Sequence, residues 1–239
     1  ELISTVFRPV PLSHFYFHHH DHNIHKIMDN SKKLTLNNYF PDKPPVKPPG
    51  QKPKFKELNL SPKAKIKGIV DFVKEKELYP ALMFVFSRKN CENYARNCDV
   101  KFSDAMESKE ACKLYDYYIS TYIDKEADKI EQVWQLRDLV ARGIAVHHSG
   151  LIPVLKEIIE ILFSKKLVKL LFVTETFSVG INMPTRCVIF TDLEKWDGNM
   201  IRPLLPEEYL QMAGRAGRRG LDSYGSVIYA PISKPVTSS

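Results

Sequence analysis

Short apolar runs alternate with amphipathic stretches from residue 61 onward, and this alternation constrains the fold of the chain more than any other feature. A continuous apolar run of this length is typical of a strand that is covered on both faces. The runs are 81–86, 144–148, 168–173, 187–191 and 226–230. Strands that alternate with helices indicate βαβ units, so the sequence predicts an α/β fold whose doubly wound, mostly parallel sheet is flanked by helices.

The stretches between the runs carry helical signals. Ser61 and Pro62 are a capping residue and a first-turn proline, and they predict a helix that starts at this point. A clean helical stripe follows residue 152, formed by Leu155, Ile158, Ile159, Leu162 and Phe163. We also expect a helix over 90–97, one long helical region over 105–142 and a short leading strand over 12–17.

Polar clusters follow the predicted strands. Ser87 and Arg88 follow the first run, and His147, His148, Ser149 and Gly150 end or follow the second. Residues 174–184 follow the third run, and 211–220 come after the fourth run and a loop. Because parallel sheets place ligands at the carboxyl ends of their strands, we expect the clusters to form one polar rim. Structural alternatives stay open for each cluster, since hydroxyls cap helices and a histidine pair can stabilise a turn.

The decapeptide QMAGRAGRRG, residues 211–220, sets three arginines among three glycines. Guanidinium groups suit phosphate oxygens, so this stretch predicts a phosphate contact. Arg215 and Arg218 are three residues apart, which would put them on one face of a helical turn, with Arg219 pointing elsewhere. Gly214 and Gly217 would leave the backbone open to a close phosphate approach.

The net charge of +7 invites a nucleic-acid interpretation, but the positive charge is concentrated in one segment. Residues 26–67 hold eleven lysines and three acidic residues, so the rest of the chain carries about −1. Residues 41–56 also contain six prolines, which favour an extended chain. We therefore interpret 18–60 as a low-complexity, lysine- and proline-rich insertion or linker.

Metal and membrane functions are not indicated. The four cysteines lack C-x-x-C spacing, which favours reduced, buried thiols over a zinc site. The histidines of 18–25 have no regularly spaced acidic or cysteine partners, so we interpret them as a polar tract. The sequence contains no apolar run long enough to cross a membrane as a helix, and its start shows no secretory pattern.

Several stretches together resemble a known family. FVFSRKNCENYA, VTETFSVGINMPTR and LLPEEYLQMAGRAGRRGLD are similar to motifs IV, V and VI of superfamily 2 helicases. RPVPLSHFYF and RGIAVHHSGLIPVLKEIIEILF narrow the likeness to superkiller-type, exosome-associated DExH-box RNA helicases. The resemblance covers about 5–17 and 61–230 and implies a RecA-like fold. It implies that 1–17 is a lead-in strand from a first RecA-like domain and that 61–239 is the helicase C-terminal domain.

The resemblance also implies roles for single residues. Gln211, Arg215 and Arg218 would face ATP across a cleft as catalytic groups, and Gly180 and Asn182 would contact the nucleotide. The RNA backbone would meet residues from four motifs, namely Ser87, Arg88, His148, Gly150, Thr174, Glu175 and Thr176. The stretch 192–203 stands where relatives carry a hairpin that parts the duplex. Its Trp196 either stacks on a base or, as we favour, anchors the loop.

The chain resembles half of an ATPase. It contains neither G-x-x-x-x-G-K-[ST] nor a D-E-x-H or D-E-x-D run, so the residues that would hold ATP and Mg²⁺ belong mainly to the first RecA-like domain. We expect the isolated chain neither to hydrolyse ATP nor to unwind RNA. A DNA helicase of the same superfamily and a non-catalytic RecA-like scaffold remain alternatives.

For the full-length protein, the resemblance implies ATP-dependent 3′–5′ RNA unwinding that feeds exosome-type decay. The implied partners are single-stranded RNA, the amino-terminal RecA-like domain and the superkiller complex or RNA exosome, with no membrane. The implied location is the cytoplasm, with the nucleus as the alternative.

Overall fold

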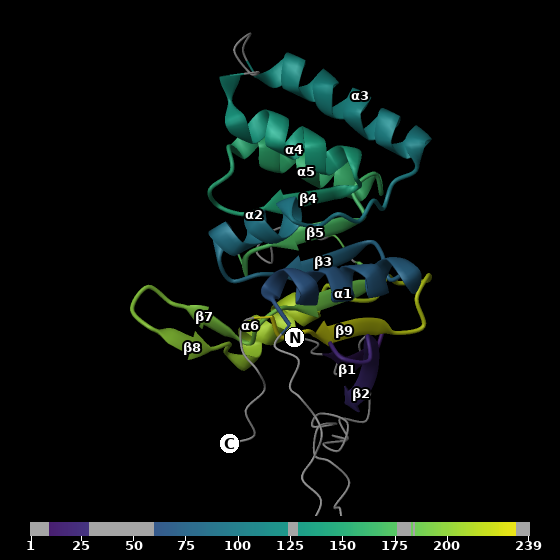
Figure 1. Cartoon of the computed structure of the whole chain (residues 1–239), viewed down its shortest axis with the longest axis vertical. Coiled ribbons are helices and arrows are strands. Elements are labelled where there is room, and N and C mark those ends of the chain that lie inside the picture. The colour runs from purple at the N-terminus through teal and green to yellow at the C-terminus, as the bar shows by residue number, and fades with distance from the viewer. Residues whose placement is uncertain (1–9, 29–59, 124–128, 176–182, 184, 233–239) are drawn as a thin grey trace, which may run out of the picture.

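The computed structural model describes residues 10–28, 60–123, 129–175, 183 and 185–232, and its main sheet has helices on both faces (Figure 1). The sheet has seven strands in the order β2-β1-β9-β6-β3-β5-β4. All neighbouring strands are parallel except the edge pair β1–β2. The strands are β1 (Leu12–His18), β2 (Asn23–Met28), β3 (Ala81–Phe84), β4 (Ile144–His147), β5 (Leu170–Val173), β6 (Cys187–Phe190) and β9 (Gly225–Tyr229).

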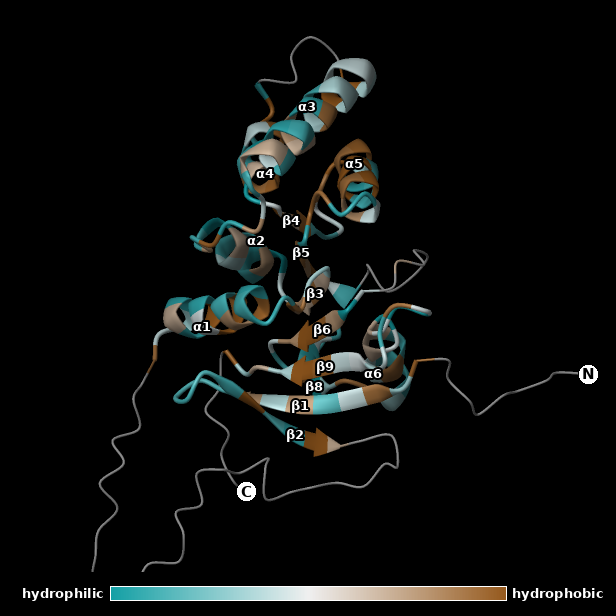
Figure 2. Ribbon diagram, turned by 90° about the vertical axis from the view of Figure 1, so that its right-hand side faces the viewer, coloured by the Kyte–Doolittle hydropathy of each residue, from teal (hydrophilic) through white to brown (hydrophobic). Residues whose placement is uncertain are grey.

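The central strands confirm the predicted doubly wound, mostly parallel α/β fold. Every residue of β3, β4, β5 and β6 is buried, as expected where helices cover both faces of a sheet. Figure 2 shows α1 and α2 on one face and α5 and α6 on the other, with the hydrophobic strands between them. The helices are α1 (Pro62–Glu75), α2 (Arg88–Arg96), α3 (Ala105–Tyr122), α4 (Glu131–Ala141), α5 (Pro153–Ser164) and α6 (Pro206–Ala213).

The long helical region predicted for 105–142 is two helices, α3 and α4, which pack against each other beyond the β4 edge (Figure 1). The Tyr115 hydroxyl donates to the carbonyl of Val133 at 2.8 Å, and Arg137 binds both carboxylate oxygens of Asp116 at 2.7 Å. The sequence between the helices contains no glycine or proline, so nothing in the pattern marked the interruption.

The start of the chain also differs from expectation. The leading strand is present as β1, but it belongs to this sheet, where it pairs in parallel with β9. Residues 23–28, assigned to the linker, form β2 and pair with β1 in antiparallel fashion. The Asp21 carboxylate caps the connecting turn by accepting the amide of Asn23 at 2.9 Å. An edge strand needs one neighbour only, so a polar sequence can form it; residues 29–59 of the predicted linker lie outside the described residues.

A second, two-stranded sheet projects from the carboxyl edge of the main sheet. Its strands are β7 (Glu194–Trp196) and β8 (Ile201–Pro203), paired in antiparallel fashion. Gly198, with φ +109°, lies in the turn between them. The hairpin predicted for 192–203 is therefore present. Among the described residues, no helix is long and apolar enough to cross a bilayer.

Candidate functional site

The predicted site residues lie at two opposite edges of the sheet, so the prediction of one polar rim is wrong. Ser87, His148 and Thr174 follow β3, β4 and β5 at the carboxyl edge. The arginines of the decapeptide precede β9 at the amino edge. There the carbonyl of Arg215 accepts the amide of Thr185 at 2.8 Å, and Thr185 leads into β6. The decapeptide reaches the amino edge because α6 returns the chain across one face of the sheet after the β7–β8 hairpin.

At the carboxyl edge, Ser87 and Arg88 start α2. The Ser87 hydroxyl accepts the amide of Asn90 at 3.3 Å, so it serves as the N-cap of this helix. Arg88 is exposed and lies over Gly150, since a Cβ built on Gly150 would be 3.5 Å from Arg88 Cδ. The structure thus brings together a guanidinium, a helix N-terminus and an exposed glycine backbone, a combination that suits a phosphate group.

His148, predicted to touch RNA, is only 1% exposed. Its Nδ1 accepts the amide of Gly150 at 3.1 Å, which places the ring proton on Nε2, 3.2 Å from Glu92 Oε1. Burial lowers the pKa of His148, against the raising effect of Glu92. The ring holds the turn from inside and is not presented to solvent in this structure. The hydrogen-bonded turn, the structural alternative, describes His148 better than a direct phosphate contact does.

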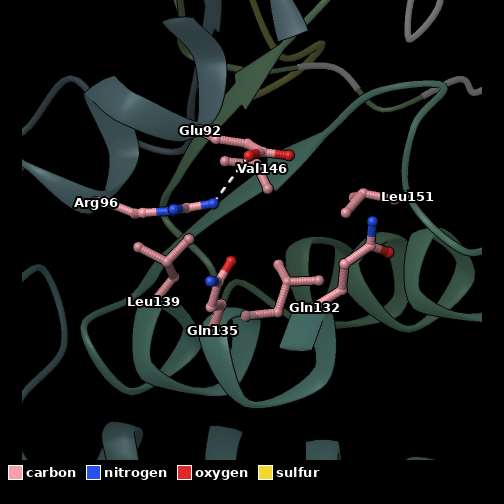
Figure 3. Close-up of a pocket in the computed structure, with 8 residues that line it drawn as sticks. Glu92, Arg96, Gln132, Gln135, Leu139, Val146 and Leu151 are labelled. Atoms are coloured by element: carbon pink, nitrogen blue, oxygen red, sulfur yellow. Dashed lines mark hydrogen bonds and ion pairs between the residues drawn. The ribbon is translucent and has the colours of Figure 1, made fainter. Parts of the chain in front are cut away.

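Gln132 of α4, one of the residues drawn in Figure 3, also holds this loop. Its amide nitrogen donates to the carbonyl of Gly150 at 3.0 Å, and its oxygen accepts the amide of Ile152 at 3.2 Å. Polar residues on helix surfaces are common, so no sequence signal marked this one. The cavity that it lines with Glu92 and Arg96 has a volume of about 20 Å³, enough for about one water molecule. We interpret this cavity as a small gap in the packing next to the loop.

The next cluster follows β5. Thr174 is buried, and its amide donates to the carbonyl of His147 at 3.3 Å, which ties the two strand ends together. Glu175 is half-buried beside it. The predicted site residues Thr176, Gly180 and Asn182 lie outside the described residues.

At the amino edge, only residues 211–213 of the decapeptide are helical. α6 ends at Ala213, with exposed Gln211 in its last turn. Arg215 lies in the turn that follows and Arg218 lies beyond that turn, so the prediction that they share one face of a helical turn is wrong. Ala216, between them, forms a parallel bridge to Thr185. Both arginines are half-buried, and burial lowers the pKa of Arg215.

Position 217 requires a glycine for a different reason from the one predicted. Its φ is +92°, and an added Cβ would lie 2.4 Å from Cγ1 of Val10 and 3.1 Å from the Cα of Gly225. Gly225 is equally tight, with an added Cβ 2.5 Å from the carbonyl carbon of Ala216. Two chain segments therefore cross here with no room for a side chain. Gly217 serves this crossing, and its space is not left open for a phosphate.

The β7–β8 hairpin is fixed at its base and apolar at its tip. Glu208 of α6 binds both guanidinium terminal nitrogens of Arg202 at 2.9 and 3.0 Å and the ammonium of Lys195 at 2.8 Å. These bonds, from Arg202 first, hold the pKa of Glu208 far below its usual value. Trp196 is 58% exposed and Ile201 62%, so the favoured interpretation of Trp196 as a loop anchor is wrong.

The described residues contain no group of three or more histidine, cysteine or carboxylate side chains placed to hold a metal ion. Cys91, Cys98 and Cys187 are buried, free thiols, and burial raises the pKa of each.

Comparisons with known proteins identify the domain. The family model described as "Helicase conserved C-terminal domain" matches residues 117–220. "Antiviral helicase SKI2" of Saccharomyces cerevisiae is 48% identical over 170 residues, which are 71% of this chain and 13% of that protein. "Exosome RNA helicase MTR4" of Homo sapiens is 38% identical over 234 residues, with shares of 95% and 22%. "DExH-box ATP-dependent RNA helicase DExH9" of Arabidopsis thaliana is 34% identical over 237 residues, with shares of 95% and 24%.

The chain thus spans less than a quarter of the length of these relatives. The family match falls on α3 through the decapeptide, and the parallel sheet with helices on both faces is the architecture of a RecA-like domain. The chain therefore carries the C-terminal, RecA-like helicase domain of an SKI2/MTR4-type superfamily 2 helicase.

Proposed function

We propose that the full-length protein is an ATP-dependent RNA helicase, in which this chain supplies the second half of the ATPase and part of the RNA path. Relatives named as RNA helicases support this proposal. This chain has no phosphate-binding loop, so ATP and Mg²⁺ would be held mainly by an amino-terminal RecA-like domain. The isolated chain is then inactive.

The observation that carries the proposal is the separation of two polar surfaces on one sheet. Arg215 and Arg218 lie at the amino edge, next to the turn before β6. Arg88 and the exposed Gly150 lie at the carboxyl edge. A nucleotide and a nucleic-acid strand can therefore bind the same domain at once without competing for residues.

At the nucleotide surface, closure of the two RecA-like domains brings Gln211, Arg215 and Arg218 to the triphosphate, with Gly180 and Asn182 contacting the nucleotide. Cleavage of the terminal phosphate spreads negative charge over its oxygens. Guanidinium groups delivered on closure stabilise that charge, an effect worth about 10³–10⁵ in rate for arginine fingers. Closure itself is a domain movement driven by ligand contacts to both halves.

At the nucleic-acid surface, Ser87, Arg88, Gly150 and residues 174–176 contact the RNA backbone, with His148 holding the loop in place. Backbone contacts position a strand without reading its bases, so little sequence preference is expected. Alternate closing and opening steps the protein 3′ to 5′ along the strand, and the exposed tip of the β7–β8 hairpin meets the duplex.

By analogy with the relatives named "Antiviral helicase SKI2" and "Exosome RNA helicase MTR4", we propose that the protein feeds RNA to an exosome-type decay machinery, with the superkiller complex or the exosome as partner. We propose a cytoplasmic location, with the nucleus as the alternative. Imaging of the tagged full-length protein and its co-purification with exosome subunits test these points.

The central experiment measures RNA-stimulated ATP hydrolysis by the full-length protein. Arg218→Ala should lower kcat by about 10³-fold or more. Arg219→Ala is the matched control, because Arg219 is exposed and adjacent, and it should leave kcat within a few-fold of wild type. Equal activity of Arg218→Ala, Arg215→Ala and wild type would instead favour a non-catalytic scaffold.

Two further measurements complete the test. Stimulation of the ATPase by DNA equal to that by RNA would favour a DNA helicase, since a protein that senses the 2′-hydroxyl distinguishes the two polymers. Duplexes with a 3′ or a 5′ overhang report the direction of movement. Unwinding of the 5′-overhang duplex alone would contradict the proposed polarity.

A further inference from the structure

Arg218 and Asp222 form a closed hydrogen-bonded unit at the amino edge of the sheet. The Asp222 carboxylate accepts three hydrogen bonds from Arg218: from Nε at 2.8 Å and the backbone amide at 2.9 Å on Oδ2, and from Nη2 at 2.8 Å on Oδ1. The amide of Asp222 in turn donates to the carbonyl of Arg218 at 3.0 Å. The Asp222 side chain is 7% exposed, so water competes little for these bonds.

This arrangement fixes the direction of the guanidinium. A carboxylate on the Nε and Nη2 edge holds the planar group in one orientation, whereas an arginine side chain without such a partner samples many orientations. The third nitrogen, Nη1, has no partner within the described part of the chain. Two N–H donors are therefore held in a defined position at the edge where the family match ends.

The charges around the pair favour the ionised form of Asp222. Hydrogen bonding to Arg218 holds the pKa of Asp222 below its usual value, and the charge of Arg186 adds to this effect. Arg186 is itself held by the carbonyl of Glu77, to which its Nη1 donates at 2.8 Å. Asp222 therefore stays ionised while it holds Arg218.

We propose that Asp222 is a positioning residue for ATP hydrolysis: it fixes Arg218 before the nucleotide arrives, with Nη1 directed to the terminal phosphate. The inference rests on the proposed function of Arg218. Without the carboxylate, the arginine must be ordered during each reaction cycle. The cost falls on the transition state, in which the phosphate charge is greatest.

The test uses the full-length protein and RNA-stimulated ATP hydrolysis. Asp222→Asn keeps the shape and removes the charge, and it should lower kcat about ten- to thirty-fold, the scale of arginine side-chain ordering, with KM nearly unchanged. Asp222→Glu restores the charge and should recover part of the loss. Asp138→Asn is the matched control, because the exposed Asp138 forms an i,i+4 pair with Arg142 just before β4, and three strands separate β4 from β9, near which Asp222 lies.

A second readout separates positioning from a merely structural role. The transition-state analogue formed by ADP, Mg²⁺ and aluminium fluoride should lose more affinity for Asp222→Asn than ADP alone does. In an Arg218→Ala background, Asp222→Asn should have no further effect on kcat, because the aspartate acts through the arginine.

The outcomes separate this inference from the function on which it rests. If Asp222→Asn lowers kcat by the same factor with and without Arg218, or weakens ADP and the analogue equally, the positioning role is overturned. If Arg218→Ala lowers kcat and Asp222→Asn does not, only the role of Asp222 falls. If Arg218→Ala itself leaves kcat unchanged, the proposed function of the arginine fails.

Discussion

Gly217→Ala should destabilise the domain through two additive effects. The residue has φ +92°, a conformation that costs a residue with a Cβ about 1–2 kcal/mol. The new Cβ would also lie 2.4 Å from Cγ1 of Val10 and 3.1 Å from backbone atoms of Gly225, and overpacking of this kind costs about 1–3 kcal/mol. The total of about 2–5 kcal/mol corresponds to a decrease in Tm of about 4–20 °C for a domain of this size.

Gly220 offers a matched control a few residues away. Its φ is +76°, but no atom lies within 4 Å of an added Cβ, so Gly220→Ala should cost only the backbone strain, about 1–2 kcal/mol. Thermal and urea unfolding of the 239-residue chain would measure both variants. Equal stability of the two variants would refute the steric argument. A Gly217→Ala variant of full stability with weakened nucleotide binding in the full-length protein would restore the idea of a phosphate approach.

Three further predictions concern other parts of the molecule. Burial lowers the pKa of His19 to about 4, below the ordinary 6.5, so on acidification the unfolded chain takes up the proton first. The free energy of unfolding should therefore be at its full value above about pH 6.5 and should fall by up to about 3 kcal/mol toward pH 4. Urea unfolding across this range should show the slope flattened in His19→Gln, with the exposed His20→Gln as control, and an unchanged slope would contradict the assignment. Gln132→Ala removes both hydrogen bonds that support the loop at Gly150, and RNA affinity of the full-length protein should fall several-fold in filter binding, whereas Gln135→Ala should not change it. Trp196→Ala should change the free energy of unfolding by less than about 0.5 kcal/mol, because the side chain is exposed, and should slow duplex unwinding; a large loss of stability would show that the indole packs against the domain.

Hydrophobic patterning was sufficient to predict the central strands of the sheet. The runs at 81–86, 168–173 and 187–191 became the buried central strands β3, β5 and β6, because a strand covered on both faces has little choice but to be apolar. The same rule could not find β2, whose side chains are exposed or half-buried. At an edge, pairing with one neighbour decides the structure, and that neighbour is not visible in local sequence.

The position of the decapeptide could not be predicted from strand order alone. After β6 the chain forms a hairpin, and α6 then returns it from the carboxyl edge to the amino edge, where the Thr185 amide donates to the Arg215 carbonyl. A crossover helix reverses the edge at which the following residues lie, so a motif after a helix belongs to the opposite end of the sheet from a motif directly after a strand. The prediction of a single rim counted only a loop between the run 187–191 and the decapeptide, and so it missed this reversal.

The sequence also could not show which group inside the domain each polar side chain contacts. The resemblance implied that His148 and Arg218 both contact ligands, and both residue types suit phosphates. The structure shows an internal partner for each, Glu92 for His148 and Asp222 for Arg218. The two differ in exposure, since His148 is buried and the Arg218 side chain is 20% exposed. Only coordinates reveal which side chain keeps donors available.

Glu208 has a mechanical consequence. It is bound by Lys195 on β7, by Arg202 on β8 and by the amide of Leu205, where α6 begins. Hairpin and helix are thereby joined at one carboxylate, and the helix extends for about 12 Å at 1.5 Å per residue before it ends next to the turn of Arg215. The orientation of the hairpin is therefore tied to that of the helix that precedes the arginines, and loss of this one carboxylate would release both at once.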